Sequence, residues 1–107
     1  MTAKIIIKRR FKKGHQRQIM ALLNELRTKA MPQSGYISGE TLTNKDFPNN
    51  VVVIATWDSM EAWYAWKESR DRYKFEAMLE MYQERPTEYN ECYLGIIPDD
   101  SVREPPA

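Results

Sequence analysis

The segment at residues 51–57, which reads VVVIATW, places the tightest constraint on what this chain can fold into. Every side chain in it except Thr56 is apolar. Successive side chains of a β-strand point to opposite faces of a sheet, so a strand here is apolar on both faces. Strands of this kind are buried on both sides. A fold that covers one face of the sheet with helices must therefore find a second cover for the other face.

Three further segments are typical of strands. Residues 3–11 predict a strand with Ile5 and Ile7 on one face and mostly charged side chains on the other. Residues 36–42 predict a second strand, and residues 88–97 predict the last one. In the second strand, alternation places four side chains on one face: Tyr36, Ser38, Glu40 and Leu42.

A first helix is predicted to begin near His15, because apolar residues then recur at the spacing of one helical face. The apolar stripe consists of Ile19, Leu22, Leu23, Leu26 and Ala30. Pro32 and the pair Ser34 and Gly35 are expected to end this helix.

A second helical region follows the apolar strand. Asp58 is expected to cap it, with Glu61 three residues later in the arrangement of a capping box. The polar run at residues 68–72 interrupts the apolar stripe, so the region divides into two helical stretches. The first stretch carries Met60, Trp63 and Trp66. The second places Phe75, Met78, Leu79 and Tyr82 on one side, and Pro86 closes it.

The resulting order is β-α-β-β-α-β, which is the ferredoxin-like α+β arrangement with an antiparallel sheet. It occupies residues 1–97, and residues 98–107 are expected to form a C-terminal tail. The helices of this fold cover one face of the sheet. A second copy packed back to back would cover the other face, which predicts a homodimer. The alternative is a monomer in which the tail covers part of that face.

Composition excludes several classes of function. Lys and Arg total 16 and Asp and Glu total 15, and the net charge of +1 argues against a general nucleic-acid binder. The longest apolar run, at residues 51–55, is far shorter than the ~20 residues that cross a bilayer. No apolar leader segment follows Met1. We therefore expect a cytoplasmic protein that binds neither nucleic acid nor membrane.

Single residues limit the chemistry further. Cys92 is the only cysteine and His15 the only histidine, which excludes an internal disulfide and a cysteine-rich zinc site. The four glycines are scattered and form no phosphate-binding loop, which argues against flavin and nicotinamide cofactors. One basic cluster is interpreted as a solvated strand end, with binding of an anionic substrate group as the alternative. It comprises Lys8, Arg9, Arg10, Lys12 and Lys13.

The stretch at residues 51–69, VVVIATWDSMEAWYAWKES, carries a more specific signal. It contains a strand that ends in Trp, then a helix start of the form Ser-x-Glu-Ala-aromatic, then a further Trp and a Ser. This pattern resembles the antibiotic biosynthesis monooxygenase domain of the dimeric α/β-barrel superfamily. Two glycine steps support the resemblance, Lys13-Gly14 after the first strand and Ser34-Gly35-Tyr36 before the second. The resemblance covers residues 3–97.

The resemblance implies a fold, a pocket and two styles of chemistry. Some members of the family oxidise quinol- or anthrone-like aromatics with molecular oxygen and no cofactor, because the substrate anion itself reduces the oxygen. Others bind and degrade heme with an Asn in the first strand, a Trp in the third strand and a His in the second helix. The corresponding positions here fall near Ile7, at Trp57 and near Glu76, so the Trp alone matches. The His and Asn that cofactor-free members often carry have no match either.

A group of aromatic residues marks the candidate substrate site. Trp63 and Trp66 lie three residues apart, so they share a side of one helix. Such rings favour a flat apolar pocket with indole N–H donors, and the alternative is ordinary core packing. Arg70 and Arg72, where the helix is interrupted, are candidates for contact with a substrate oxyanion or carboxylate. The predicted substrate-binding residues are Trp57, Trp63, Trp66, Arg70 and Tyr73.

These observations predict a cofactor-independent monooxygenase that acts on a quinol-like or polycyclic aromatic substrate. No residue stands out as the catalytic base, and neither a metal site nor a cofactor is expected. One alternative is a non-enzymatic module that binds a small aromatic ligand on the same dimeric scaffold. A second alternative is a heme-binding or heme-degrading variant with an unusual iron ligand.

Overall fold

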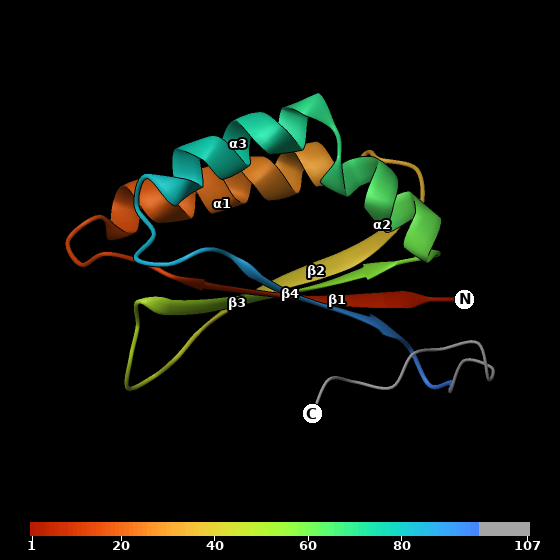
Figure 1. The fold of residues 1–107 in the computed structure, drawn as a ribbon, viewed down its shortest axis with the longest axis horizontal. Coiled ribbons are helices and arrows are strands. Elements are labelled where there is room, and N and C mark those ends of the chain that lie inside the picture. Colours follow the sequence, from red (N-terminus) through yellow and green to blue (C-terminus); the bar gives the residue numbers. More distant parts are fainter. Residues whose placement is uncertain (97–107) are drawn as a thin grey trace.

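The computed structural model describes residues 1–96, which form a four-stranded antiparallel sheet with the strand order β2-β3-β1-β4. The strands are β1 (Ala3–Arg10), β2 (Tyr36–Thr43), β3 (Asn50–Trp57) and β4 (Glu88–Tyr93). The helices are α1 (Gln16–Ala30), α2 (Met60–Lys67) and α3 (Arg70–Glu80). All three helices lie over one face of the sheet (Figure 1). The ferredoxin-like α+β fold predicted from the sequence is confirmed.

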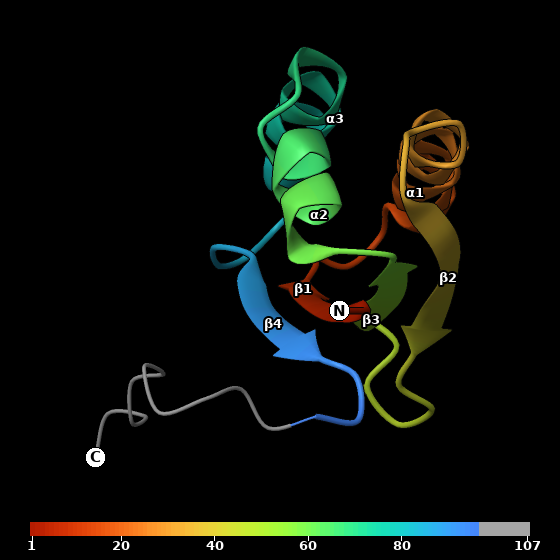
Figure 2. The ribbon, with the colours of Figure 1, turned by 90° about the vertical axis from the view of Figure 1, so that its right-hand side faces the viewer.

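The two central strands explain why the helices pack on this face. Ile5 pairs with Ala55 and Ile7 with Val53, so the apolar sides of β1 and β3 form one continuous surface. The helices bury that surface (Figure 2). On the opposite face of the sheet, Ile6 of β1 pairs with Ile54 of β3, and both side chains are only partly buried. No helix or strand within residues 1–96 supplies the second cover that β3 requires.

β2 departs from the simple alternation predicted for it. Tyr36 pairs with Trp57 and the next pair is Ser38 with Thr56, so a bulge shifts the register between the two pairs. Tyr36 therefore faces the helices, as Gly39 does, and Ser38 faces the other way. The prediction of one shared face for Tyr36, Ser38, Glu40 and Leu42 is wrong for Tyr36. The bulge brings the Tyr36 ring against Trp57.

The predicted interruption of the second helical region is confirmed as a break between α2 and α3. Ser59 caps α2 with extended backbone angles, and its hydroxyl accepts a hydrogen bond from the Ala62 N–H at 3.1 Å. The prediction of Asp58 as the cap is wrong by one residue, because α2 begins at Met60 and Ser59 directly precedes it. The Asp58 N–H donates to the Gly35 carbonyl at 2.7 Å, which ties the start of β2 to the end of β3. Ser69 caps α3 in the same way as Ser59 caps α2.

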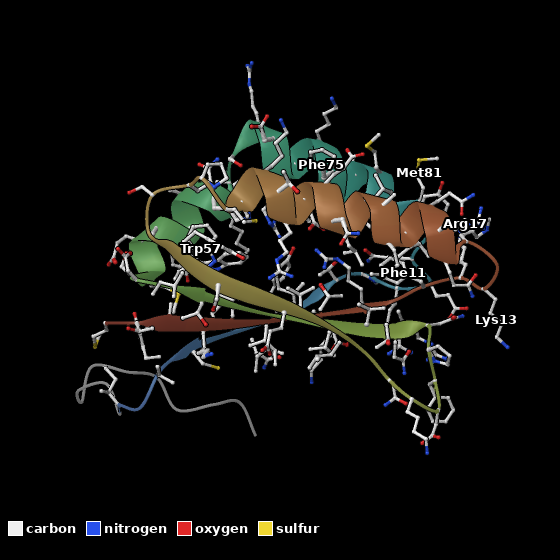
Figure 3. All side chains as sticks on the ribbon, turned by 180° about the vertical axis from the view of Figure 1, so that it is seen from behind. Phe11, Lys13, Arg17, Trp57, Phe75 and Met81 are labelled. Atoms are coloured by element: carbon white, nitrogen blue, oxygen red, sulfur yellow. The ribbon has the colours of Figure 1, made fainter. Side chains whose placement is uncertain are left out.

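The core divides into two apolar clusters, one containing Trp57 and the other Phe11. Figure 3 shows these two residues toward opposite ends of the space between helices and sheet, and Met81 outside it. Met78 and Met81 are 41% and 72% exposed, so the placement of Met78 on the buried side of the helix is wrong. The buried positions of α3 follow a regular helical spacing that excludes position 78: Arg72, Phe75, Glu76 and Leu79.

The last strand is shorter than predicted. β4 ends at Tyr93, whereas the sequence prediction ran to residue 97. Gly95 has a φ of 68°, a backbone conformation that a continuing strand does not allow. The tail predicted at residues 98–107 lies outside the described residues.

Candidate functional site

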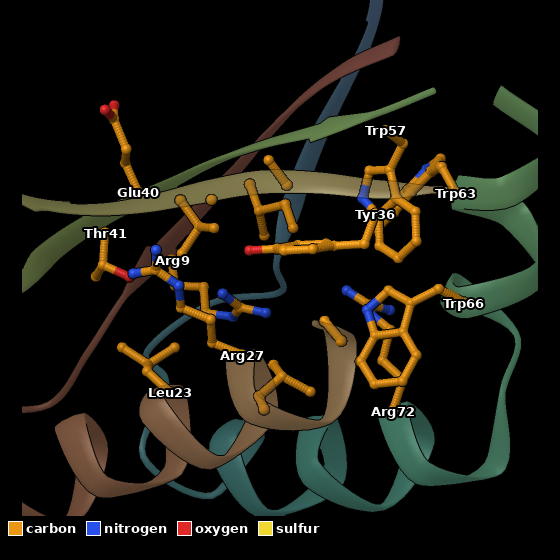
Figure 4. Close-up of a pocket in the computed structure, with 16 residues that line it drawn as sticks. Arg9, Leu23, Arg27, Tyr36, Glu40, Thr41, Trp57, Trp63, Trp66 and Arg72 are labelled. Atoms are coloured by element: carbon orange, nitrogen blue, oxygen red, sulfur yellow. The ribbon is translucent and has the colours of Figure 1, made fainter. Parts of the chain in front are cut away.

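A pocket opens between the sheet and the helices. It has an empty volume of about 510 Å³ including its open mouth, and its narrow interior offers about 60 Å³ to water. Its wall draws on both central strands, β2 and all three helices. Its aromatic side chains are Tyr36 and three tryptophans, and its charged side chains include three arginines. In Figure 4 the tryptophans gather toward one end, and Arg9, Arg27 and Thr41 toward the other.

Three tryptophans and Tyr36 form the aromatic end of the pocket. Trp57 and Trp63 are each 1% exposed, and Trp66 is 4% exposed. The Tyr36 ring meets Trp57 edge-on at 5.3 Å, and Trp57 lies 6.2 Å from Trp63, measured between ring centroids. These are ordinary distances for interacting aromatic pairs. The group therefore offers flat, preformed apolar walls to a ring-shaped ligand.

The local chain path places these rings together. β3 ends at Trp57, and the Ser59 cap starts α2 two residues later, so Trp63 turns back over the end of the strand. Gly35 permits the close approach of this turn, because a Cβ there would lie 2.5 Å from the Asp58 carboxylate and 2.6 Å from the Ala62 methyl. Its φ of 88° also favours glycine.

The indole N–H groups of two neighbouring tryptophans have different surroundings. Trp63 Nε1 donates to Glu91 Oε2 at 2.5 Å. Trp57 Nε1 is buried and has no hydrogen-bond partner among residues 1–96. Buried donors are almost always paired, so an unpaired one in a pocket wall marks a place for a ligand acceptor or a water. Trp57 thus offers a donor at the aromatic end of the pocket.

A buried ionic cluster lies beside the aromatic group. Arg9, Arg72 and Glu76 are 3%, 4% and 8% exposed, and both arginines form ion pairs with Glu76 Oε1. Arg72 also donates to the Tyr89 hydroxyl at 2.9 Å and stacks on the Trp63 ring at 5.1 Å. Arg9 Nε is buried and, in the part of the chain that the structure describes, has no partner. Arg9 and Arg72 line the pocket.

Gly39 shapes the middle of the pocket. Its position on β2 lies under the Tyr36 hydroxyl, and a Cβ at Gly39 would approach that oxygen to 2.9 Å. A side chain at position 39 would therefore displace the Tyr36 hydroxyl. Figure 4 shows this hydroxyl directed toward the end of the pocket that holds Arg9 and Arg27.

The structure brings together part of the predicted site. Trp57, Trp63 and Trp66 line the pocket, and so does Arg72. Arg70 is exposed, Tyr73 is 78% exposed, and neither lines the pocket. His15 lies against Tyr82 at a centroid distance of 5.1 Å, away from the pocket lining. Cys92, which lies in β4, is exposed.

Sequence reasoning did not place Tyr36 and Glu76 at this site, and it gave Arg9 a substrate contact only as the alternative for the whole basic cluster. The interpretation of the basic cluster as a solvated strand end is wrong for Arg9, which is buried. The signal was present, because Arg9 continues the inward alternation of Ile5 and Ile7. Tyr36 was hidden by the bulge. Glu76 occupies the buried spacing of α3, where a carboxylate requires partners.

Glu91 fixes α2 to β4 at the back of the aromatic group. Burial acts to raise the pKa of this carboxyl, but hydrogen bonds from Trp63, Lys67 and Tyr64 and the charge of Lys67 outweigh it and hold the pKa below its usual value. The Lys67 ammonium lies 3.1 Å from Glu91 Oε2 and 4.5 Å from the centre of the Tyr89 ring. Glu91 is therefore an ionised anchor that orients Trp63.

Heme does not fit the side chains of this pocket. The position near Glu76, where the resemblance expects an iron-ligating histidine, carries a carboxylate that two arginines already bind. The single histidine does not line the pocket. Within residues 1–96, no group of three His, Cys, Asp or Glu side chains gathers to hold a metal ion.

Comparison with known proteins identifies the family. The family model described as antibiotic biosynthesis monooxygenase matches residues 2–78. The chain belongs to the antibiotic biosynthesis monooxygenase family, which confirms the resemblance seen in the sequence. No curated protein is significantly similar to it in sequence.

Solved structures share the fold at low sequence identity. SnoaB from Streptomyces nogalater, described as a cofactor-independent oxygenase, has a TM-score of 0.80 at 14% identity, covering 90% of this chain and 95% of SnoaB. A conserved protein from Methanosarcina mazei has a TM-score of 0.81 at 15% identity, over 86% of this chain and 91% of that one. Rv0793 from Mycobacterium tuberculosis has a TM-score of 0.78 at 16% identity, over 94% and 99%. At these low identities, the similarities show that the fold is shared.

The length and apolar character of the helices decide whether one of them could span a membrane. Among the described residues, none of the helices combines the length and the apolar character that a membrane crossing requires.

Proposed function

We propose that this chain is a cofactor-independent monooxygenase that oxidises a quinol-like or polycyclic aromatic substrate with molecular oxygen. The observation that carries this proposal is the pocket wall formed by Trp57, Trp63 and Trp66, in which the Trp57 N–H is free to meet a substrate oxygen. Stacking on these rings would hold a flat substrate, and the free Trp57 N–H would orient it. The cofactor-independent oxygenase SnoaB has the same fold, which supports the proposal.

The reaction takes all of its electrons from the substrate. A phenolic substrate loses its O–H proton, and the ring carbon opposite the oxygen, which carries hydrogen, bonds to O₂ to give a hydroperoxide. Cleavage of the O–O bond with loss of water converts that carbon into a carbonyl. One oxygen atom enters the quinone and the other leaves as water, so the four electrons that reduce O₂ come from the substrate. The pocket's part is to bind the ring, orient it and exclude bulk water.

Oxygen uptake tests the proposal. The panel begins with single-ring phenols whose ring carbon opposite the hydroxyl carries hydrogen, because the interior of the pocket is narrow, and proceeds to 1-naphthols and anthrones. We expect uptake above the autoxidation rate and, with ¹⁸O₂, one labelled atom in the quinone. Trp57→Ala should abolish this rate, whereas Tyr73→Ala should retain it, because that ring lies outside the pocket lining. Uptake equal to autoxidation across the panel would refute the oxygenase proposal.

A binding module without turnover is the second candidate. It is favoured by the engagement of Glu76, since this buried carboxylate is occupied by two arginines and is not free to act as a base. A ligand-induced rise in melting temperature without oxygen uptake would support this candidate. A saturable change in the hemin spectrum on titration would instead support the heme alternative.

The proposal includes a homodimer with the sheets packed back to back. Its support is the uncovered sheet face, where Ile6 and Ile54 pair at the centre and Leu42 is 48% exposed. An apolar sheet face of this kind requires a cover. We also propose a cytoplasmic location, for which an exposed, unpaired Cys92 is suited to a reducing compartment.

A further inference from the structure

We propose that the pocket binds its phenolic substrate as the phenolate, with the Arg9 Nε–H as the donor to the phenolate oxygen. This inference deepens the proposed function and depends on it for the phenolic nature of the substrate. It assigns a catalytic residue in a pocket where no side chain is placed as a base. It rests on three observations, which are the local charge balance, the free donor of Arg9 and the position of Arg9 relative to the tryptophans.

The charges buried at the pocket do not cancel. Arg9 and Arg72 are both at least 96% buried, and Glu76 is the one buried carboxylate that pairs with them. At the mouth, exposed Arg27 adds a further guanidinium, whereas Glu40 pairs with Ile54 and lies on the opposite face of the sheet. Residues 1–96 therefore leave at least one guanidinium charge at the pocket without a counter-ion. Buried charge without a partner is costly, so an anionic ligand gains from entering this pocket.

The free donor belongs to Arg9 rather than to Arg72. Arg72 donates to Glu76, to the Tyr89 hydroxyl and to the Lys67 carbonyl. Arg9 uses Nη2 for Glu76, which holds its guanidinium in place, and leaves the buried Nε–H unpaired. This buried donor and the uncompensated charge suit an anionic oxygen, and the tryptophan walls of the same pocket favour the oxygen of a phenolate.

The placement of Arg9 suits an aromatic phenol. Both Arg9 and the three tryptophans line the same pocket, and Figure 4 shows Arg9 toward the end opposite Trp57. A substrate whose ring lies on the tryptophans can direct an oxygen toward Arg9 past the Tyr36 hydroxyl. Glu76 acts on this step as a positioning residue, because it contacts Arg9 and not the substrate.

The chemical step is an ionisation. The substrate O–H bond breaks, its proton leaves to water at the open mouth of the pocket, and the electron pair stays on oxygen. Arg9 remains protonated and forms no covalent bond; it stabilises the negative oxygen by charge and by one hydrogen bond. The phenolate is the electron-rich species that reduces O₂, so stabilising it replaces the missing base.

The test uses a phenol whose ionisation is visible. The full chain is titrated with 4-nitrophenol over a pH series, and the absorbance of the nitrophenolate gives the pKa of the bound probe. We expect that pKa to fall by about one unit below the free value, which is a roughly tenfold preference for the phenolate. 4-Nitroanisole, which has no ionisable proton, should bind at least tenfold more weakly at a pH where the free phenol is ionised. A bound pKa equal to or above the free value would overturn the inference.

Adjacent arginines on opposite faces of β1 provide matched variants. Arg9→Gln should abolish the pKa shift of the probe, whereas Arg10→Gln should preserve it, because Arg10 points to solvent and pairs with Glu84. Arg9→Lys keeps the charge but lacks Nε–H at that place, and should retain only part of the shift. An unchanged shift in Arg9→Gln would also overturn the assignment. If Arg9→Gln fails to fold, the double variant Arg9→Gln/Glu76→Gln removes both charges together and gives the same readout.

The two proposals fail in different ways. A lowered probe pKa that depends on Arg9, together with no oxygen uptake, sustains the phenolate site and refutes the oxygenase. Oxygen uptake with an unshifted probe pKa sustains the oxygenase and refutes the role of Arg9. If both proposals hold, the rate of oxygen uptake should rise with pH as the substrate ionises. The midpoint of that rise should lie at a lower pH in the wild type than in Arg9→Gln.

Discussion

At the scale of single residues, the indole N–H groups of Trp57 and Trp63 differ although the rings are equally buried. Trp63→Phe loses a hydrogen bond to an ionised carboxylate, which contributes about 2 kcal/mol. Trp57→Phe loses no such bond. We expect Trp57→Phe to cost at least about 1 kcal/mol less in unfolding free energy than Trp63→Phe, and to lower kcat/KM about tenfold or more.

Urea unfolding and oxygen uptake measured on both variants check this prediction. Each variant serves as the control for the other, because the ring lost in both cases is the same and both rings pack in the same cluster. Equal losses of stability in the two variants would mean that Trp57 Nε1 has a structural partner, and Trp57 would then offer no free donor to a substrate.

Glu91 gives a prediction with a defined sign in pH. Because its pKa is lowered in the folded state, its contribution to stability is fully present above the ordinary carboxyl value of 4.5 and is lost as the pH falls through the lowered value. Glu91→Gln should therefore destabilise the protein by about 1 kcal/mol at pH 7, with a smaller difference at pH 3. Urea unfolding at both pH values measures this. Glu88→Gln, an exposed carboxylate on the same strand, is the control, and a Glu91→Gln difference that grew on acidification would contradict the assignment.

At the scale of elements, the step from α1 into β2 depends on Gly35. Gly35→Ala combines a left-handed φ with clashes against Asp58 and Ala62, so we expect a loss of about 3 kcal/mol in unfolding free energy. Gly14→Ala has a similar φ but no atom within 4 Å of the added Cβ, and should cost about 1 kcal/mol. Thermal or urea unfolding of both variants separates the backbone effect from the clash. Equal losses would show that the approach of Gly35 to α2 is not tight.

Most of the helices and strands could be predicted, because the buried side chains of each element recur with the period of a helix or of a strand. The stripe Ile19, Leu23 and Ala30 in α1 and the alternation Ile5, Ile7 in β1 lie buried as expected. What periodicity does not encode is a local event that changes register, such as the bulge after Tyr36. The candidate site depends on such events. Tyr36 lines the pocket because the bulge turns its side chain toward the helices. Arg9 can be buried because Glu76, 67 residues away in the chain, forms an ion pair with it. No local pattern announces that pairing.

At the scale of the whole molecule, the sheet has two faces and the described chain covers one of them. The helix-covered face holds the pocket, so pocket and uncovered face lie on opposite sides of β3. The uncovered face combines the Ile6–Ile54 pair with Val52 and Leu42. An assembly through this face leaves both pockets open, and each subunit keeps its own Arg9 and Trp57 on the far side of the sheet.

The dimer prediction is tested by placing a charge at the centre of that face. A stable interface buries about 1,200–2,000 Å², and a carboxylate forced into its apolar centre without a partner is strongly unfavourable. Ile54→Glu should convert a dimer into a monomer in sedimentation velocity while leaving far-UV circular dichroism unchanged. Met78→Glu adds the same charge to an exposed site on α3 and should remain dimeric. A wild-type protein that sediments as a monomer at all concentrations would refute the dimer, and the cover of β3 would then have to come from residues beyond 96.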